Sequence, residues 1–218
     1  VWLLDPEHLW IRDPSWDGYN YSISGTTYTA QTANPATPIL VGGATDTRDR
    51  GPTVDGVFYP GVTVIRTDTL NAALANGSVK VVASGLIDAM GWGLNETTYP
   101  NYFINSTTSN KLTLQAGTSI NLASYKFNLP NGTFELLATS TISQSGPTTG
   151  GAIYAGTLAL GSSNAGVTKP TVTLTAADNY VTNLQASNIN SLNLYNAQAL
   201  TVNASNVSAV GAVTLTSN

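Results

Sequence analysis

The sequence predicts an all-β protein: a right-handed parallel β-helix, or solenoid, with a long loop insertion and one short helix in its N-terminal half. Short apolar alternations recur about every 20 residues in the second half of the chain, which is the spacing of a repeat architecture. Charged residues make up only 9% of the 218 residues, against about 25% in ordinary soluble domains. Long helices depend on Glu, Lys and Arg, so this composition favours β-structure. Hydrophobic residues reach 42%, which is enough to fill a core.

Residues 1–111 are predicted to form β-helix coils interrupted by excursions. This half carries all four Trp and seven of the ten Pro. A Gly- and Pro-rich stretch at about 14–60 is typical of a long insertion that leaves the coil stack, with a hairpin around Tyr19 to Thr32. A second excursion is expected at 90–102.

One short helix is expected between these two excursions, from Thr67 to Gly77. Thr67 or Asp68 is a suitable N-cap, and Asn76-Gly77 is a suitable end. Leu70, Ala73 and Leu74 would form its apolar face. The stretch from Val79 to Ala83 then has the pattern of a strand.

Residues 112–218 are predicted to be regular β-helix coils. Leu114, Leu136 and Leu158 follow one another at steps of 22 residues, and Leu174, Leu194 and Leu215 at steps of 20 and 21. Each lies in a short run with apolar residues two apart, which is the period of a strand. Weaker strands between these runs would give each coil two or three strands. The strong runs are Leu112–Leu114, Glu135–Leu137, Thr157–Leu160, Val172–Leu174, Leu192–Leu194 and Val213–Leu215, and the weaker ones are Val181–Leu184 and Ala199–Val202.

Parallel stacking explains why such short strands would be stable. One coil cannot bury its apolar face alone, whereas coils stacked about 4.8 Å apart share a continuous core. Asn at the corners tolerates a left-handed backbone and forms local hydrogen bonds. A leucine-rich repeat has a similar period, but its helical side would need more Leu and charged helix formers than this chain has.

Composition also excludes several classes of partner. The net charge is −4 and the isoelectric point about 4.6, without a basic cluster, which disfavours nucleic acid and anionic membrane. There is no cysteine, so thiolate metal sites and thiol redox chemistry are excluded. No apolar run approaches the length of a membrane span, and no cofactor or metal is expected. The chain starts and stops inside its pattern, so we expect a segment of a longer protein.

Three pieces of the first 137 residues, in order and spacing, resemble a known family. Trp2-Leu3-Leu4-Asp5-Pro6 with Leu9-Trp10-Ile11 is similar to its W-x-x-D-P-x-x-h-x-h segment. Asp68 to Val81 is similar to its helical turn and following strand, and Leu112 to Leu122 to its L-x-L-x-A-x-x-x-I-x-h coil. The family is that of the filamentous-haemagglutinin-type exoproteins. The stretch between Ile11 and Val62 is longer than the family's usual connection.

The resemblance implies a secreted protein on the surface of a Gram-negative bacterium. It implies export by two-partner secretion, with an outer-membrane transporter as partner, and a role in attachment, aggregation or biofilm formation. The lack of cysteine suits threading through a narrow barrel. The family does not fix the ligand, because some relatives end in toxins or bind haem proteins.

Aromatic residues of the excursions are the candidate ligand-binding residues. Such side chains stack on sugar rings, so a host or bacterial cell-surface glycan or a matrix polysaccharide is the expected ligand. The alternative is that these residues pin the loops onto the β-helix as a satellite core. Function concentrates on loops held by a rigid scaffold, which keeps the group a candidate. The candidates are Trp16, Tyr19, Tyr21, Tyr28, Tyr59, Trp92 and Tyr99, in a group that also includes Trp10 and Tyr102.

Carboxylates and the single histidine are weaker candidates for chemistry. Asp46, Asp49 and Asp55 lie in the insertion, whereas polysaccharide-cleaving β-helices need two carboxylates placed on the stack. They alternate with arginines, so local ion pairs are the simpler interpretation. His8 has only local carboxylates near it and is expected to be structural. No catalytic residue and no enzyme activity is therefore predicted, and a polysaccharide-active enzyme is the less favoured alternative to an adhesin or a passive stalk.

Seven Asn-x-Ser/Thr sequences are candidate glycosylation acceptors. The 21 asparagines, with Ser and Thr at 50 of 218 residues, would give about five such sequences by chance. Their number alone therefore does not establish modification. The acceptors are Asn20, Asn76, Asn95, Asn105, Asn131, Asn203 and Asn206.

Overall fold

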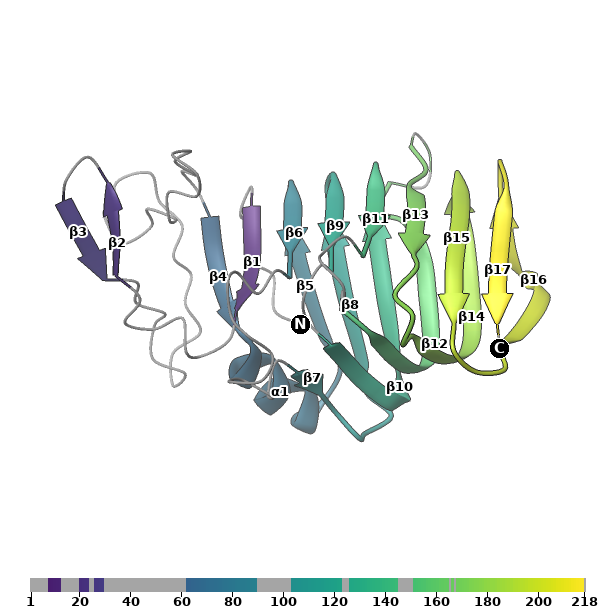
Figure 1. The fold of residues 1–218 in the computed structure, drawn as a ribbon, viewed down its shortest axis with the longest axis horizontal. Helices are drawn as coiled ribbons and strands as arrows, with labels where there is room; N and C mark the ends of the chain where they lie inside the picture. Colours follow the sequence, from purple (N-terminus) through teal and green to yellow (C-terminus); the bar gives the residue numbers. More distant parts are fainter. Residues whose placement is uncertain are drawn as a thin grey trace.

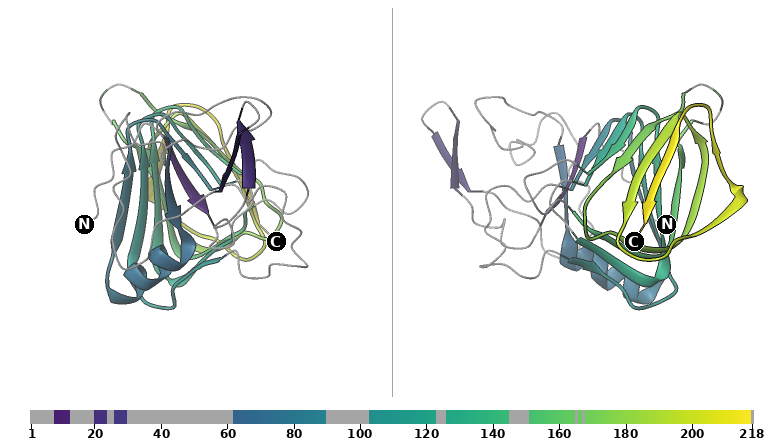
Figure 2. Two further views of the ribbon diagram at one scale, coloured as in Figure 1. Left: turned by 90° about the vertical axis from the view of Figure 1, so that its left-hand side faces the viewer. Right: turned by 45° about the vertical axis from the view of Figure 1, so that its right-hand side comes forward.

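The computed structural model describes residues 8–12, 20–23, 26–29, 62–89, 103–122, 126–144, 151–164, 166 and 168–217. These residues form a parallel β-helix, as the sequence predicts. From residue 79 onward the chain contributes strands to two large parallel sheets in turn, and these coils stack in chain order toward residue 217 (Figure 1). Seen toward the end of the stack, the strands enclose one interior (Figure 2).

The eight-stranded sheet collects the short strands of the coils. Its order is β4-β1-β6-β9-β11-β13-β15-β17, and every neighbouring pair is parallel. Its strands are β1 (His8–Arg12), β4 (Val62–Arg66), β6 (Leu86–Asp88), β9 (Ser119–Asn121), β11 (Thr141–Ser143), β13 (Thr171–Leu174), β15 (Ser191–Asn196) and β17 (Val213–Ser217).

The seven-stranded sheet collects the longer strands. Its order is β5-β8-β10-β12-β14-β16, with β7 paired to the first part of β10. Its strands are β5 (Val79–Ala83), β7 (Phe103–Asn105), β8 (Lys111–Ala116), β10 (Lys126–Ala138), β12 (Ile153–Ser162), β14 (Tyr180–Ile189) and β16 (Thr201–Ala209).

Two of these strands turn a corner of the coil. The offset between paired residues of β10 and β12 changes between Leu129 and Thr133, where the register shifts. Phe127 pairs with Ile153 before the corner, and Thr133 pairs with Thr157 after it. The first halves of β10, β12 and β14, together with β7, therefore form a third, narrow face beside the two main sheets.

Apolar and polar residues alternate within the strands. An apolar side chain of one coil, often a leucine, therefore stacks on an apolar side chain of the next coil. Leu114 pairs with Leu136, Leu174 with Leu194, and Leu194 with Leu215, as predicted. The predicted step from Leu136 to Leu158 is wrong, because Leu136 pairs with Leu160 and Leu158 pairs with Phe134. Leu158 and Leu160 both face the core, so a shift of two residues keeps the burial pattern and changes only the neighbour.

The core is continuous along the stack. Leu112, Leu136, Leu158 and Val172 are fully buried and belong to one hydrophobic cluster, and each such side chain stabilises the fold by about 1.5–3 kcal/mol relative to exposure. Phe127 and Phe134 flank the corner of β10, and their rings stack with centroids 4.5 Å apart.

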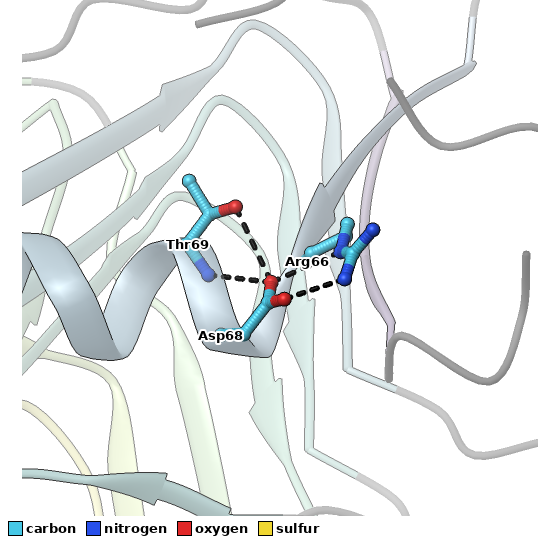
Figure 3. A network of polar contacts seen from close by, with 3 residues as sticks. All are labelled: Arg66, Asp68 and Thr69. Carbon is cyan, nitrogen blue, oxygen red and sulfur yellow. Dashed lines mark hydrogen bonds and ion pairs between the residues drawn. The ribbon is translucent and has the colours of Figure 1, made fainter. Parts of the chain in front are cut away.

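The predicted helix is present as α1 (Thr67–Asn76), with Leu70 and Leu74 buried against the core. Arg66 occupies the N-cap position, and its side chain forms no capping hydrogen bond, so the expectation of a Thr67 or Asp68 cap is wrong. Asp68 lies in the first turn, where its carboxylate accepts a hydrogen bond from the Thr69 N–H at 2.7 Å and pairs with the Arg66 guanidinium (Figure 3). That carboxylate still satisfies a free N–H at the positive end of the helix. The helix ends at Gly77, as predicted.

Helix α1 lies beside β7 at the N-terminal end of the narrow face (Figure 1). The Asn71 side-chain oxygen accepts a hydrogen bond from the Asn105 N–H at 2.8 Å, and the Asn110 side chain donates to the Leu74 carbonyl at 2.7 Å. The Asn71 side chain satisfies a β7 backbone N–H that a further strand would otherwise have satisfied, and the Asn110 side chain satisfies a carbonyl in the last turn of the helix.

A hairpin forms within the expected range of Tyr19 to Thr32. Strands β2 (Asn20–Ile23) and β3 (Thr26–Thr29) pair antiparallel, with Asn20 opposite Thr29. The rest of the expected insertion at 14–60 lies outside the described residues, and so does the expected excursion at 90–102. The division of the chain at residue 111 stays a prediction.

Two asparagines near the corners act through buried side chains. Asn188, with φ of 54°, is the one non-glycine residue with positive φ in the ranges that the structure describes, so the expected left-handed role is confined to it. Asn179 and Asn196 are instead fully buried. The Asn196 side-chain oxygen accepts from the Val181 N–H at 2.8 Å, and its amide donates to the Val181 carbonyl at 2.9 Å.

Candidate functional site

A shallow groove lies on the outer surface of the seven-stranded sheet, across β10, β12 and β14. Its volume is about 390 Å³. We call it the lateral groove. It is lined by Glu135, Leu137, Ala159, Leu160, Gly161, Ser162, Gln185, Ala186, Ser187 and Asn188.

The lateral groove follows from the sizes of the outward side chains on three stacked strands. Glu135 pairs with Ala159 and Ala159 with Gln185, so a methyl group lies between two long polar side chains. Two residues further along the same strands, Leu137 pairs with Gly161. A Cβ at Gly161 would come within 3.1 Å of the Leu137 side chain and 3.3 Å of the Ser187 carbonyl oxygen. Small residues on the middle strand therefore make the floor, and larger ones on the outer strands make the walls.

Glu135 is the one carboxylate that lines the lateral groove, and hydrogen bonds hold one of its two oxygens. Its Oε2 accepts hydrogen bonds from Thr113 Oγ1 at 2.7 Å and from Lys111 Nζ at 3.1 Å. Partial burial raises the pKa of Glu135, but the hydrogen bonds from Thr113 and Lys111 and the charges of Lys111 and Lys80 outweigh it. The net pKa lies below the usual value, so the group is ionised at neutral pH.

Several polar groups of the lateral groove have no partner within the described part of the chain. Both hydrogen bonds of Glu135 go to Oε2, which leaves Oε1 free. The side chains of Gln185, Ser187 and Asn188 form no hydrogen bond with another described residue. All three residues are exposed, so water satisfies them and a ligand could replace that water.

Two tyrosines form a separate feature on the narrow face. Tyr154 and Tyr180 pair in register and their rings stack, with centroids 4.9 Å apart. Burial first, and then Asp178 and Tyr180, raise the pKa of Tyr154 above its usual value. Lys126 lies 3.8 Å from Asp178 in an ion pair. The feature is an aromatic and polar strip.

The predicted aromatic candidates fall mostly outside the described residues. These are Trp16, Tyr19, Tyr59, Trp92 and Tyr99. Tyr21 and Tyr28 are directly opposite each other in the β2–β3 hairpin, and their roles as ligand contacts stay predictions. Trp10 is only 5% exposed in β1, where it alternates with the core residues Leu9 and Ile11, so its ring is covered rather than presented to solvent.

The candidate glycosylation acceptors also lie partly within and partly outside the described residues. Asn76, Asn105 and Asn131 are exposed. The Asn76 amide donates to the Ala72 carbonyl, and the Asn131 amide to the Thr107 carbonyl. Asn105 accepts from the Asn128 amide at 2.8 Å. Of the others, Asn20, Asn203 and Asn206 lie on strands β2 and β16, and Asn95 lies outside the described residues.

The histidine and the carboxylates are the groups suited to metal binding or to acid–base chemistry. His8 is half-buried in β1, and Asp46, Asp49 and Asp55 lie outside the described residues. Over the described ranges, no three His, Cys, Asp or Glu side chains gather closely enough to hold a metal ion. Across the same ranges, no helix has both the length and the apolar character that crossing a bilayer requires.

Sequence reasoning missed the lateral groove. The sequence pattern marks Glu135 only as part of a predicted strand, and it does not single out Gln185, Ser187 or Asn188. The signal that could have revealed the groove is the alternation of large and small outward side chains from one strand to the next. That alternation is visible only when the register between coils is known. Comparison with family models, curated proteins and solved structures found no match.

Proposed function

We propose that this chain is a segment of a large secreted adhesin of a bacterial cell surface, which serves in attachment, aggregation or biofilm formation. The observation that carries the proposal is a parallel β-helix that presents a polar, hollowed lateral surface. Such a scaffold holds binding groups in fixed positions at little entropic cost.

The sequence resemblance to filamentous-haemagglutinin-type exoproteins supports the same role. The strands that carry the resembling segments, β1, β5 and β8, belong to the coil stack. Under this proposal the protein leaves a Gram-negative cell through an outer-membrane transporter. Carbohydrate would then contact the aromatic insertion, the lateral surface of the coils, or both.

An enzyme that cleaves polysaccharide is the less favoured alternative. Two carboxylates set for acid and base work, or for a nucleophile, are the usual requirement. Glu135 is the single carboxylate that lines the lateral groove, and its low pKa suits an acceptor of hydrogen bonds better than a proton donor.

A passive stalk is the second candidate, and one observation favours it. No charged residue follows Asp178 in the sequence, and β13, β15 and β17 continue the stack in unbroken register. Coils of this kind would extend a filament without binding anything.

The test is attachment by the whole chain displayed on a non-adherent bacterial cell. Attachment to epithelial cells and to a biofilm matrix is compared with that of a variant in which residues 15–58 are replaced by a Gly-Ser linker. Because β1 and β4 are parallel, the linker must return along a five-residue strand, which is about 16 Å.

Attachment by the complete chain supports the adhesin, and its loss in the linker variant would place the contact in the insertion. Attachment by neither chain, with unchanged β-sheet circular dichroism, would favour the stalk. Release of reducing ends from a polysaccharide panel would favour the enzyme.

A further inference from the structure

We infer that the lateral groove binds a neutral saccharide, on the coil stack itself and apart from the aromatic insertion. This saccharide site would serve the attachment function proposed above. The biological role of the site rests on that proposed function, but saccharide binding itself does not. The shape of the lateral groove, its polar atoms without a described partner and its charge support the inference.

The shape suits a flat, partly apolar ring. Ala159 and Gly161 give a floor without long side chains, and Leu137 gives an apolar wall. The C–H face of a pyranose matches such a surface. The volume of about 390 Å³ is within the range of small-molecule sites. The groove crosses three stacked strands and is open to solvent, so a longer chain could extend beyond it in either direction.

The polar atoms around this floor suit hydroxyl groups. Glu135 Oε1 is a charged acceptor, and hydroxyl donors form strong hydrogen bonds with such an oxygen. Gln185 and Asn188 each offer an amide donor and acceptor, and Ser187 adds a hydroxyl. A sugar hydroxyl donates and accepts at once, so neighbouring hydroxyls match this mixture.

Glu135 is also positioned before any ligand arrives. Thr113 and Lys111 bind its other oxygen, so the carboxylate loses little freedom when Oε1 accepts a ligand hydroxyl. The role of Thr113 and Lys111 is thus to position the group that would contact the ligand.

Charge then selects a neutral ligand. The ion pair with Lys111 offsets the carboxylate, and the other lining residues are uncharged. An acidic polysaccharide would bring its carboxylates or sulfates close to the Glu135 carboxylate, and repulsion between these like charges would oppose binding. A cationic ligand would have to compete with Lys111.

The experiment measures binding of the whole 218-residue chain to oligosaccharides by calorimetry. The neutral probes are oligomers of glucose, galactose, mannose and N-acetylglucosamine, and the acidic probes are heparin and hyaluronan. At least one neutral probe is expected to bind. Glu135→Gln should then weaken binding about tenfold, the loss typical of one charge-assisted hydrogen bond. Ala159→Leu fills the floor and should abolish binding.

Two matched variants control for folding and for general effects. Asp178→Asn makes the same carboxyl-to-amide exchange in the ion pair with Lys126, and Ala72→Leu makes the same enlargement at an exposed position of α1. Both should leave the affinity within about twofold, because surface changes away from a site are close to neutral. Circular dichroism melting checks that every variant is folded.

The inference is overturned if no neutral probe binds, if only acidic probes bind, or if both groove variants bind as the native chain does. Failure of saccharide binding while displayed cells still attach would leave the adhesin proposal standing and remove this site. Groove-dependent binding without attachment would support the site and remove the adhesin role.

Discussion

Removal of the Asn179 side chain should cost the fold as much as a large cavity in its core. This asparagine is fully buried in the turn before β14. Its side-chain oxygen accepts from the Ile153 N–H and from the Gln144 amide, both at 2.9 Å. Its amide donates to Gln144 Oε1 at 3.0 Å and to the Tyr195 carbonyl at 3.1 Å. One side chain therefore joins successive coils.

The magnitude follows from the groups that Asn179→Ala would leave without partners. The buried Ile153 N–H loses its acceptor, which costs about 1–3 kcal/mol. The partly buried Gln144 amide loses a donor and an acceptor, each worth about 0.5–1.5 kcal/mol when exchanged for water. The sum predicts a loss of about 4 kcal/mol, within a range of about 2–6 kcal/mol, in the free energy of unfolding.

The assay is urea unfolding followed by circular dichroism, with Asn193→Ala as the matched control. Asn193 is an exposed residue of β15, so its removal should change stability by less than about 0.5 kcal/mol. If Asn179→Ala is no more destabilised than Asn193→Ala, the buried hydrogen bonds do not hold the coils together and the reasoning is wrong.

Three further predictions concern the core, a close backbone contact and pH. Leu136→Ala should destabilise the fold by about 2–5 kcal/mol in urea unfolding, because its fully buried side chain lies in the middle of the stack; a loss below about 1 kcal/mol would contradict this. Gly117→Ala places a Cβ 1.7 Å from the Ser84 carbonyl oxygen and should cost about 3 kcal/mol in the same urea unfolding assay, whereas Gly77→Ala, with nothing within 4 Å, is the near-neutral control. Because the pKa of Glu135 is lowered by folding, the unfolded chain binds the proton more readily, so the contribution of this carboxylate is present above about pH 4.3 and is lost as pH falls through the lower folded pKa. The melting temperature of the native chain should therefore fall more steeply below that pH than that of Glu135→Gln, and parallel curves would refute the coupling.

The fold was predictable because its main determinant is local. Alternation in Leu192–Leu194 and Val213–Leu215 marks strands, and the repeated spacing marks stacking. The turn residues after Leu74 likewise determined where α1 ends. The register at β10 was not predictable, because Leu158 and Leu160 both suit a buried position. Which of them meets Leu136 depends on how many residues the corner takes.

The lateral groove needed information that a single strand does not contain. Ala159 and Gly161 are unremarkable in the sequence, and they form a floor only because Glu135 and Gln185 stand on the adjacent strands. The ionised state of Glu135 depends on Lys111 and Thr113 from the preceding coil. Long-range register therefore decides both the shape and the charge of the candidate site.

The position of β1 has a consequence for the order of folding. Strand β1 pairs on one side with β4 and on the other with β6, although it precedes both in the chain. The later coils close over steps of about 20 residues and can add one after another, whereas β1 must return across residues 13–61 to enter its place. Folding should thus start in the later coils, with β1 docking last. A peptide carrying His8–Arg12, supplied separately, would then restore the vacant position in a chain that starts at β4, much as a fragment complements a split protein.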